Sequence, residues 1–122
     1  MSFTHLNVAS SYSAHYGVST PPQLAAAAHA MGAEALALTD RDGLYGAVKH
    51  VAACLEHGLR PLLGVNLALL DTPGHAAGRI ILLARGNSNG AGYADLCRSI
   101  SQAHQAPHGI PGLTRRQISH RV

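Results

Sequence analysis

Residues 35–48 read ALALTDRDGLYGAV, and this stretch decides the fold class. It begins with four apolar residues, as expected of a strand covered by other elements. A polar turn follows, and an apolar pattern of helical period then runs on as far as His57, with Gly58 in the position of a helix-ending residue. A buried strand that leads through a turn into a helix is the repeating unit of α/β proteins.

The rest of the chain repeats this alternation. The expected strands span residues 3–9, 34–39, 62–70 and 79–85, with a turn over residues 71–78. The expected helices span residues 20–32, 44–57 and 91–104, and a short one opens at residues 114–117. Thr20 and Thr114 each precede a glutamine by three positions, which is the capping-box spacing. This order predicts an α/β fold in which parallel strands alternate with helices.

Composition limits the class of protein. The chain has 122 residues, 47% of them hydrophobic, which is enough for one small domain with a core. It contains no run of apolar residues long enough to span a membrane and no signal peptide, so we expect a soluble, cytoplasmic protein. Cys54 and Cys97 fall within helical patterns and are interpreted as reduced thiols. The formal charge of +3 is compatible with a nucleic-acid partner.

Four blocks of sequence, in order, resemble a known family. Residues 3–13 read FTHLNVASSYS and are followed by Gly17; residues 35–48 form the second block, and RPLLGVN at 60–66 the third. The fourth joins IILLAR at 80–85 to GYADLCR at 92–98 and SQAH at 101–104. Together they resemble the PHP (polymerase and histidinol phosphatase) domain that begins bacterial C-family DNA polymerases. The likeness is to the DNA polymerase III alpha-subunit type, in particular its error-prone branch.

The resemblance implies part of a PHP-type (β/α) barrel, a distorted or incomplete TIM-like barrel. It also implies a site at the mouth of this barrel, where PHP enzymes hold divalent metals such as zinc or manganese with histidines and carboxylates. Carried over position by position, the family's ligands fall on the following residues, which we call the ligand-equivalent positions: the His-x-His pair on Asn7 and Ala9, an acidic ligand on Asp40, the next His on Arg41, a Glu on Asn66 and a later His on Arg79. Tyr16 stands where an acidic residue is usual, and His5 is typical of the family but lies outside the ligand pair.

These replacements predict a vestigial metal site. Only Asp40 keeps a ligand-type side chain. Amides and a methyl group do not hold several cations, and guanidiniums repel them. We therefore expect no cofactor and no catalytic residue. His15, in the first loop, is the candidate replacement ligand, and the competing interpretation is an ordinary surface histidine.

Arg41 lies between Asp40 and Asp42, which allows two interpretations. The three side chains form an ion-paired cluster that fills the former metal site, or the loop charges are simply exposed to solvent. Neither arrangement supports hydrolysis.

The resemblance implies that the chain is one domain of a larger protein. Residues 1–122 are interpreted as a PHP-type domain, the N-terminal portion of a longer polymerase, which is a nucleotidyltransferase of DNA replication or repair. The domain is expected to act as a non-catalytic scaffold and docking domain. The alternative is a metal-dependent PHP phosphoesterase or exonuclease with noncanonical ligands.

Several partners are expected. They are the remainder of the polymerase chain, a proofreading or accessory subunit, and DNA through the parent polymerase, with no membrane partner. Four strands of a barrel leave an apolar edge, expected near residues 80–84 or at the first strand. The fragment is therefore expected to self-associate as a dimer.

Overall fold

The computed structural model describes residues 3–13, 16–72, 74–85 and 90–120. The regular elements follow in this order: α1 (Pro21–Ala30), β1 (Ala35–Leu38), α2 (Ala47–Glu56), β2 (Arg60–Thr72), β3 (His75–Leu83), α3 (Ala91–His104), a 3₁₀ turn (Pro107–Gly109), β4 (Gly112–Thr114) and α4 (Arg115–Ser119). No helix in these ranges is long and apolar enough to cross a membrane.

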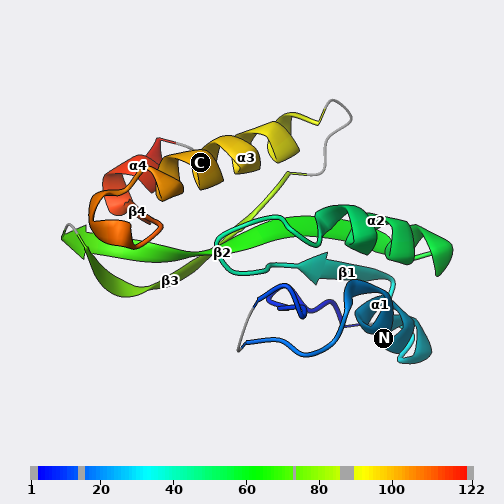
Figure 1. Cartoon of the computed structure of the whole chain (residues 1–122). Coiled ribbons are helices and arrows are strands. Elements are labelled where there is room, and N and C mark those ends of the chain that lie inside the picture. The colour runs from blue at the N-terminus through cyan, green and yellow to red at the C-terminus, as the bar shows by residue number, and fades with distance from the viewer. Residues whose placement is uncertain (1–2, 14–15, 73, 86–89, 121–122) are drawn as a thin grey trace.

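Strand β2 pairs with every other strand and runs through the length of the molecule (Figure 1). Its first residues pair in parallel with β1, residues 64–72 pair antiparallel with β3, and residues 68–70 pair in parallel with β4. Because β3 occupies one edge of β2 at these residues, β4 lies on the other edge. A parallel bridge between Arg41 and Asn66 places the continuation of β1 on that same edge. Strands β1 and β4 therefore follow one another along one side of β2.

The α/β class is confirmed, but the sheet is mixed and not purely parallel. Thr72 already pairs with His75, and β3 begins where residues 71–78 were expected to form a turn. A parallel pair requires a crossover of a dozen or more residues, usually a helix, whereas an antiparallel pair closes with a short turn. No helix separates the third and fourth expected strands, so an antiparallel pairing was the physically consistent choice.

The first expected strand is also corrected, because residues 3–10 form no regular strand. The segment nevertheless lies beside β1. Ala37 donates its N–H to the carbonyl of His5 at 3.4 Å, and Thr39 donates to the carbonyl of Val8 at 2.8 Å. Two such contacts hold the segment in place without a continuous ladder. The short β4, conversely, was not expected, because only three residues separate a Pro-rich connector from a helix.

The helix ends follow their local sequence. Both predicted capping boxes are formed, at Thr20 for α1 and at Thr114 for α4. Gly32 and Gly58 follow α1 and α2 with φ of 79° and 73°, which favours glycine. Helix α3 has the predicted bounds, whereas α2 starts three residues later than expected because residues 44–46 form part of a turn.

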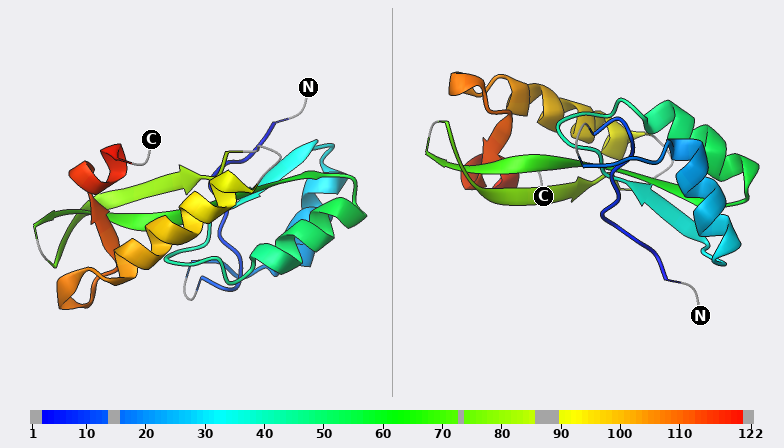
Figure 2. Two further views of the ribbon diagram at one scale, coloured as in Figure 1. Left: turned by 90° about the horizontal axis from the view of Figure 1, so that it is seen from above. Right: turned by 60° about the horizontal axis from the view of Figure 1, so that its bottom comes forward.

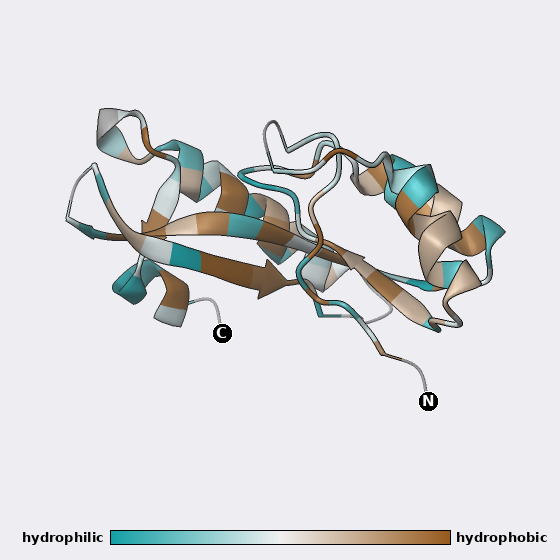
Figure 3. Ribbon diagram, turned by 90° about the horizontal axis from the view of Figure 1, so that it is seen from below, coloured by the Kyte–Doolittle hydropathy of each residue, from teal (hydrophilic) through white to brown (hydrophobic). Residues whose placement is uncertain are grey.

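Two hydrophobic clusters form the core, one for each half of β2. The first unites α1, β1 and α2 through Ala25, Ala28, Leu36, Ala53, Cys54 and Leu59. The second unites β2, α3 and β4 through Val65, Leu67, Leu96, Ala103 and Leu113. Helices α2 and α3 lie one after the other on the same face of the sheet (Figure 2). From the other side, the largely apolar ribbons of β2 and β3 lie in front of α3 (Figure 3).

A histidine is buried in the first cluster. His50 is fully enclosed, and its Nε2 donates to the carbonyl of Leu36 at 3.1 Å. Burial lowers the pKa of His50 below its ordinary value of 6.5. Burial also raises the pKa of the neighbouring Cys54 thiol. Both cysteines are free, Cys54 buried and Cys97 half-buried.

Candidate functional site

The side chain of Asp40 connects the first loop to the end of β1 through hydrogen bonds. Its Oδ1 accepts hydrogen bonds from the backbone N–H of Ser10 at 2.6 Å and from Oγ of Ser13 at 2.8 Å. Its Oδ2 accepts from Oγ of Ser10 at 2.8 Å. The side chain is 2% exposed. A buried carboxylate satisfied by three donors is a structural anchor, and its lone pairs are directed at the protein.

Asn7 and Ala9, which stand at the His-x-His pair, offer no free donor pair to a metal. The Oδ1 of Asn7 accepts from the hydroxyl of Thr39 at 3.1 Å. The same hydroxyl accepts from the N–H of Val8 at 2.9 Å. Ala9 carries only a methyl group. This part of the site is therefore a hydrogen-bonded link between the first segment and β1.

Arg41 does not form the ion-paired cluster considered from the sequence. Its backbone N–H donates to Oγ of Ser13 at 2.9 Å, and its guanidinium lies over the ring of Tyr16, 3.7 Å from the centroid. None of the ion pairs found among the described residues includes Arg41. The Arg41 side chain is thus held by a cation–π contact and not by an ion pair with a carboxylate.

Arg79, and not Arg41, forms the ion pair with Asp42. Its Nε donates to Oδ1 of Asn66 at 2.7 Å, and its Nη2 donates to the carbonyl of Asn66 at 2.8 Å. The same Nη2 forms an ion pair with Oδ1 of Asp42 at 3.1 Å. Arg79 lies in the middle of β3, opposite Ala68, and not near the beginning of its strand as expected. Two ligand-equivalent positions, Asn66 and Arg79, are therefore bonded to each other.

Asp42 is contacted by three elements of the fold. Its N–H donates to the carbonyl of Asn66 at 2.9 Å, and its own carbonyl accepts from Nε2 of His104 at 2.6 Å. Its φ of 62° is uncommon for a residue with a side chain, although aspartate tolerates it better than most. The contacts to β2, β3 and α3 fix this backbone conformation.

Sequence analysis missed three of these residues. Ser10 and Ser13 were detectable in principle, since two hydroxyls follow the first segment at turn spacing. His104 carried no signal, because its partner lies 62 positions away in the chain.

The described side chains at the ligand-equivalent positions offer few donors to a divalent metal. Such ions need several deprotonated oxygen and nitrogen donors with free lone pairs. The site instead supplies two guanidiniums, two amides that already accept hydrogen bonds and one saturated carboxylate. Across the described ranges no group of three or more His, Cys, Asp or Glu could hold a metal ion. His15 lies outside the described residues, so its role stays a prediction.

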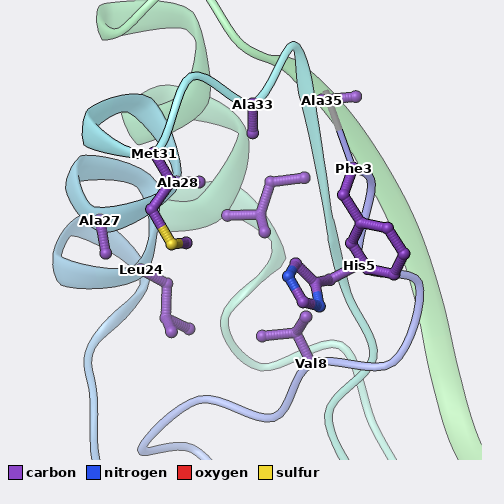
Figure 4. A pocket seen from close by; sticks show the side chains of 10 residues that line it. Phe3, His5, Val8, Leu24, Ala27, Ala28, Met31, Ala33 and Ala35 are labelled. Atoms are coloured by element: carbon purple, nitrogen blue, oxygen red, sulfur yellow. The ribbon is translucent and has the colours of Figure 1, made fainter. Parts of the chain in front are cut away.

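An apolar cavity lies elsewhere. It lies between the first segment, α1 and β1, has a volume of about 450 Å³, and is lined by the ten residues drawn in Figure 4. His5 is its one titratable lining group, and none of the ligand-equivalent positions reaches it. The cavity therefore offers no alternative metal site.

The PHP domain family matches residues 5–120. The chain belongs to the PHP family. This PHP domain is 38% identical over 111 residues to an error-prone DNA polymerase of Mycobacterium tuberculosis, covering 87% of the chain and 10% of the relative. It is 40% identical over 114 residues to that of Symbiobacterium thermophilum, covering 92% and 10%. The chain therefore spans about a tenth of the length of these relatives.

Solved structures agree on the fold of this PHP domain. An amidohydrolase from Chromobacterium violaceum superposes with a TM-score of 0.62 at 24% identity, over 84% of the chain and 33% of the neighbour. A protein assigned as a metal-dependent phosphoesterase, from Bifidobacterium adolescentis, gives 0.56 at 20% identity, over 83% and 32%. The arrangement of strands and helices is thus that of part of a PHP-like fold.

Proposed function

We propose that this PHP domain is a non-catalytic scaffold and docking domain of an error-prone DNA polymerase of the DNA polymerase III alpha-subunit type. The proposal includes that residues 1–122 are the N-terminal portion of a longer chain, which acts in DNA replication or repair in the cytoplasm. Sequence identity to error-prone polymerases supports the parent. The contact of Arg79 with Asn66 and Asp42 carries the non-catalytic role.

The guanidinium of Arg79 is a positive charge that belongs to the chain itself, at the place where a bound metal ion would carry one. It lies beside the Asp42 carboxylate and donates twice to Asn66. A divalent ion at this place would lie against a fixed positive charge, and Asn66 would have to give up its bond to Arg79 before its amide oxygen could bind the ion. Electrostatics therefore oppose metal binding even where single oxygen donors remain.

The same contacts explain how the domain serves as a scaffold. Arg79 belongs to β3, Asn66 to β2, and Asp42 to the turn that leads into α2. His104 adds the end of α3 through the carbonyl of Asp42. The network thus joins the elements of both hydrophobic clusters at the middle of β2. Within the described residues the outer edge of β3 pairs with no strand, and it offers a docking edge for the remainder of the polymerase or for a proofreading or accessory subunit.

A hydrolase assay separates this role from the alternative, a phosphoesterase or exonuclease with noncanonical ligands. The purified chain is incubated with bis(p-nitrophenyl) phosphate and with a 3′-labelled oligonucleotide in the presence of Mn²⁺ or Zn²⁺, or of EDTA. We expect no hydrolysis above the buffer blank under any of these conditions. Turnover that EDTA abolishes, and that is lost in His15→Ala but kept in the exposed control His75→Ala, would establish the enzyme instead.

A further inference from the structure

Three of the four tyrosines of the chain are exposed on two neighbouring loops. Tyr12 and Tyr16 belong to the loop after the first segment and are 39% and 62% exposed. Tyr45 belongs to the turn before α2 and is 66% exposed. The structure joins the two loops, because Ser10 and Ser13 bond to Asp40. The three rings therefore lie on one connected part of the surface.

Two cations lie on these rings. The guanidinium of Arg41 is 3.7 Å from the centroid of Tyr16, and Nζ of Lys49 is 5.8 Å from that of Tyr12. Neither cation forms an ion pair with an acid of the described residues, because Asp40 accepts hydrogen bonds from Ser10 and Ser13, and Asp42 is paired with Arg79. The surface therefore combines exposed aromatic rings with two cations that have no carboxylate partner among the described residues.

The rings are held by their surroundings before any ligand arrives. The N–H of Tyr16 donates to the carbonyl of Ser13 at 3.0 Å. The ring of Tyr45 lies against Gly43, and the ring of Tyr12 lies near Gly46, so a side chain at either glycine would meet an aromatic ring. The rings of Tyr12 and Tyr45 thus already pack against the chain, which reduces the conformational entropy that they lose on binding.

We propose that Tyr12, Tyr16, Arg41, Tyr45 and Lys49 form a binding surface for single-stranded nucleic acid. Unpaired bases stack on the tyrosine rings, and phosphates bind the edge of the Arg41 guanidinium and the Lys49 ammonium. Duplex DNA keeps its bases stacked on one another, so it uses only the two cations and binds more weakly. Arg41 is the one member of this surface that is also a ligand-equivalent position.

Fluorescence anisotropy of a labelled oligothymidylate and of a duplex of equal length tests this surface on the 122-residue chain. We expect the single strand to bind more tightly. Tyr16→Ala and Tyr45→Ala should each weaken binding at least about fivefold, as the loss of one stacked base predicts. Lys49→Gln should weaken it and reduce its salt dependence. The matched controls Tyr93→Ala and Arg98→Gln, both exposed on α3, should bind as the unchanged chain does.

Three outcomes would overturn the assignment. They are the absence of oligonucleotide binding, equal binding of duplex and single strand, and binding that is insensitive to both tyrosine variants. A polyglutamate peptide serves as the probe for an acidic protein partner. If it binds in a tyrosine-dependent way and the oligonucleotide does not, the surface belongs to a protein partner. Circular dichroism of each variant confirms that the fold is kept.

Discussion

Arg79 and Asn66 are bonded to each other across the β2–β3 pair, with Nε of the guanidinium 2.7 Å from Oδ1 of the amide. Both residues stand where the resemblance to PHP enzymes places metal ligands. The contact uses the amide oxygen that would be the remaining donor at the Asn66 position. This pairing is the physical basis of the proposed scaffold role, and it leads to measurable differences between Arg79 and other arginines.

Replacing Arg79 should destabilise the fold more than replacing an ordinary surface arginine. Arg79→Met removes three hydrogen bonds, two of them to Asn66, from a side chain that is 28% exposed. We expect a loss of about 1–2 kcal/mol in the free energy of unfolding, reduced from the full charged-bond value because the pair is partly solvated. Urea denaturation measures it.

The matched control is Arg98→Met. Arg98 pairs with Asp95 at 2.8 Å on the surface of α3, where the two side chains are 64% and 63% exposed. Its loss should cost no more than about 0.5 kcal/mol. An equal loss in the free energy of unfolding at the two positions would mean that the Arg79 contact stabilises the fold no more than an ordinary surface ion pair does.

Asp40 should be essential for stability and not for metal binding. Asp40→Ala leaves the N–H of Ser10 and two buried hydroxyls without their acceptor. We expect a loss of about 3 kcal/mol or more, since each buried donor left unsatisfied is costly. The exposed Asp95→Ala is the control, and a thermal or urea transition reports the difference. If Asp40→Ala left stability unchanged but altered metal content, Asp40 would be a ligand.

Local signals in the sequence predicted the local structure well. The capping boxes at Thr20 and Thr114, the glycines after α1 and α2, and the extent of α3 each depend on residues close in the chain. The direction of the β2–β3 pair was predicted wrongly as parallel, although the short connection between these strands fits only an antiparallel pair. The short β4 was missed because its partner in β2 lies more than forty positions earlier.

The candidate site was likewise predicted only in part. Its positions were found by motif order, and the structure brings Arg41, Asn66 and Arg79 together around the middle of β2. Which arginine meets which acid was not predictable, since it depends on the β2–β3 register that sets Arg79 beside Asn66 and Asp42. Adjacency in sequence allowed Arg41 as a partner of Asp42, with exposed loop charges as the equal alternative, whereas in the structure Asp42 pairs with Arg79.

Acid should weaken the fold through His50. Burial lowers the pKa of His50 below 6.5, so the unfolded chain takes up the proton first as the pH falls. The contribution of His50 to stability is complete above pH 6.5 and is lost progressively below that value. Urea transitions from about pH 7.5 to about pH 5.5 should show a decline that is smaller in His50→Gln. The control His120→Gln, an exposed residue after α4, should keep the wild-type slope, and an unchanged slope in His50→Gln would refute the assignment.

The open edge of β3 should cause self-association. Its outer side pairs with no described strand, and Leu83 on it is 42% exposed. Pairing with a second copy would satisfy the backbone groups and cover apolar surface. We expect Leu83→Lys to shift the sedimentation equilibrium toward monomer, and Val48→Lys on α2 to leave it unchanged. A cooperatively folding 12.7 kDa monomer of the unchanged chain at micromolar concentration would contradict this.

Metal content tests the central claim most directly. The chain is purified without an affinity tag that binds metals, equilibrated with zinc, manganese or iron(II), dialysed, and measured by elemental analysis. Because the ligand-equivalent positions carry two amides, a methyl group, two guanidiniums and one carboxylate that already accepts three hydrogen bonds, the predicted content does not exceed that of the dialysis buffer. A stoichiometric amount of any of these metals retained by the folded chain would contradict the loss of the metal site.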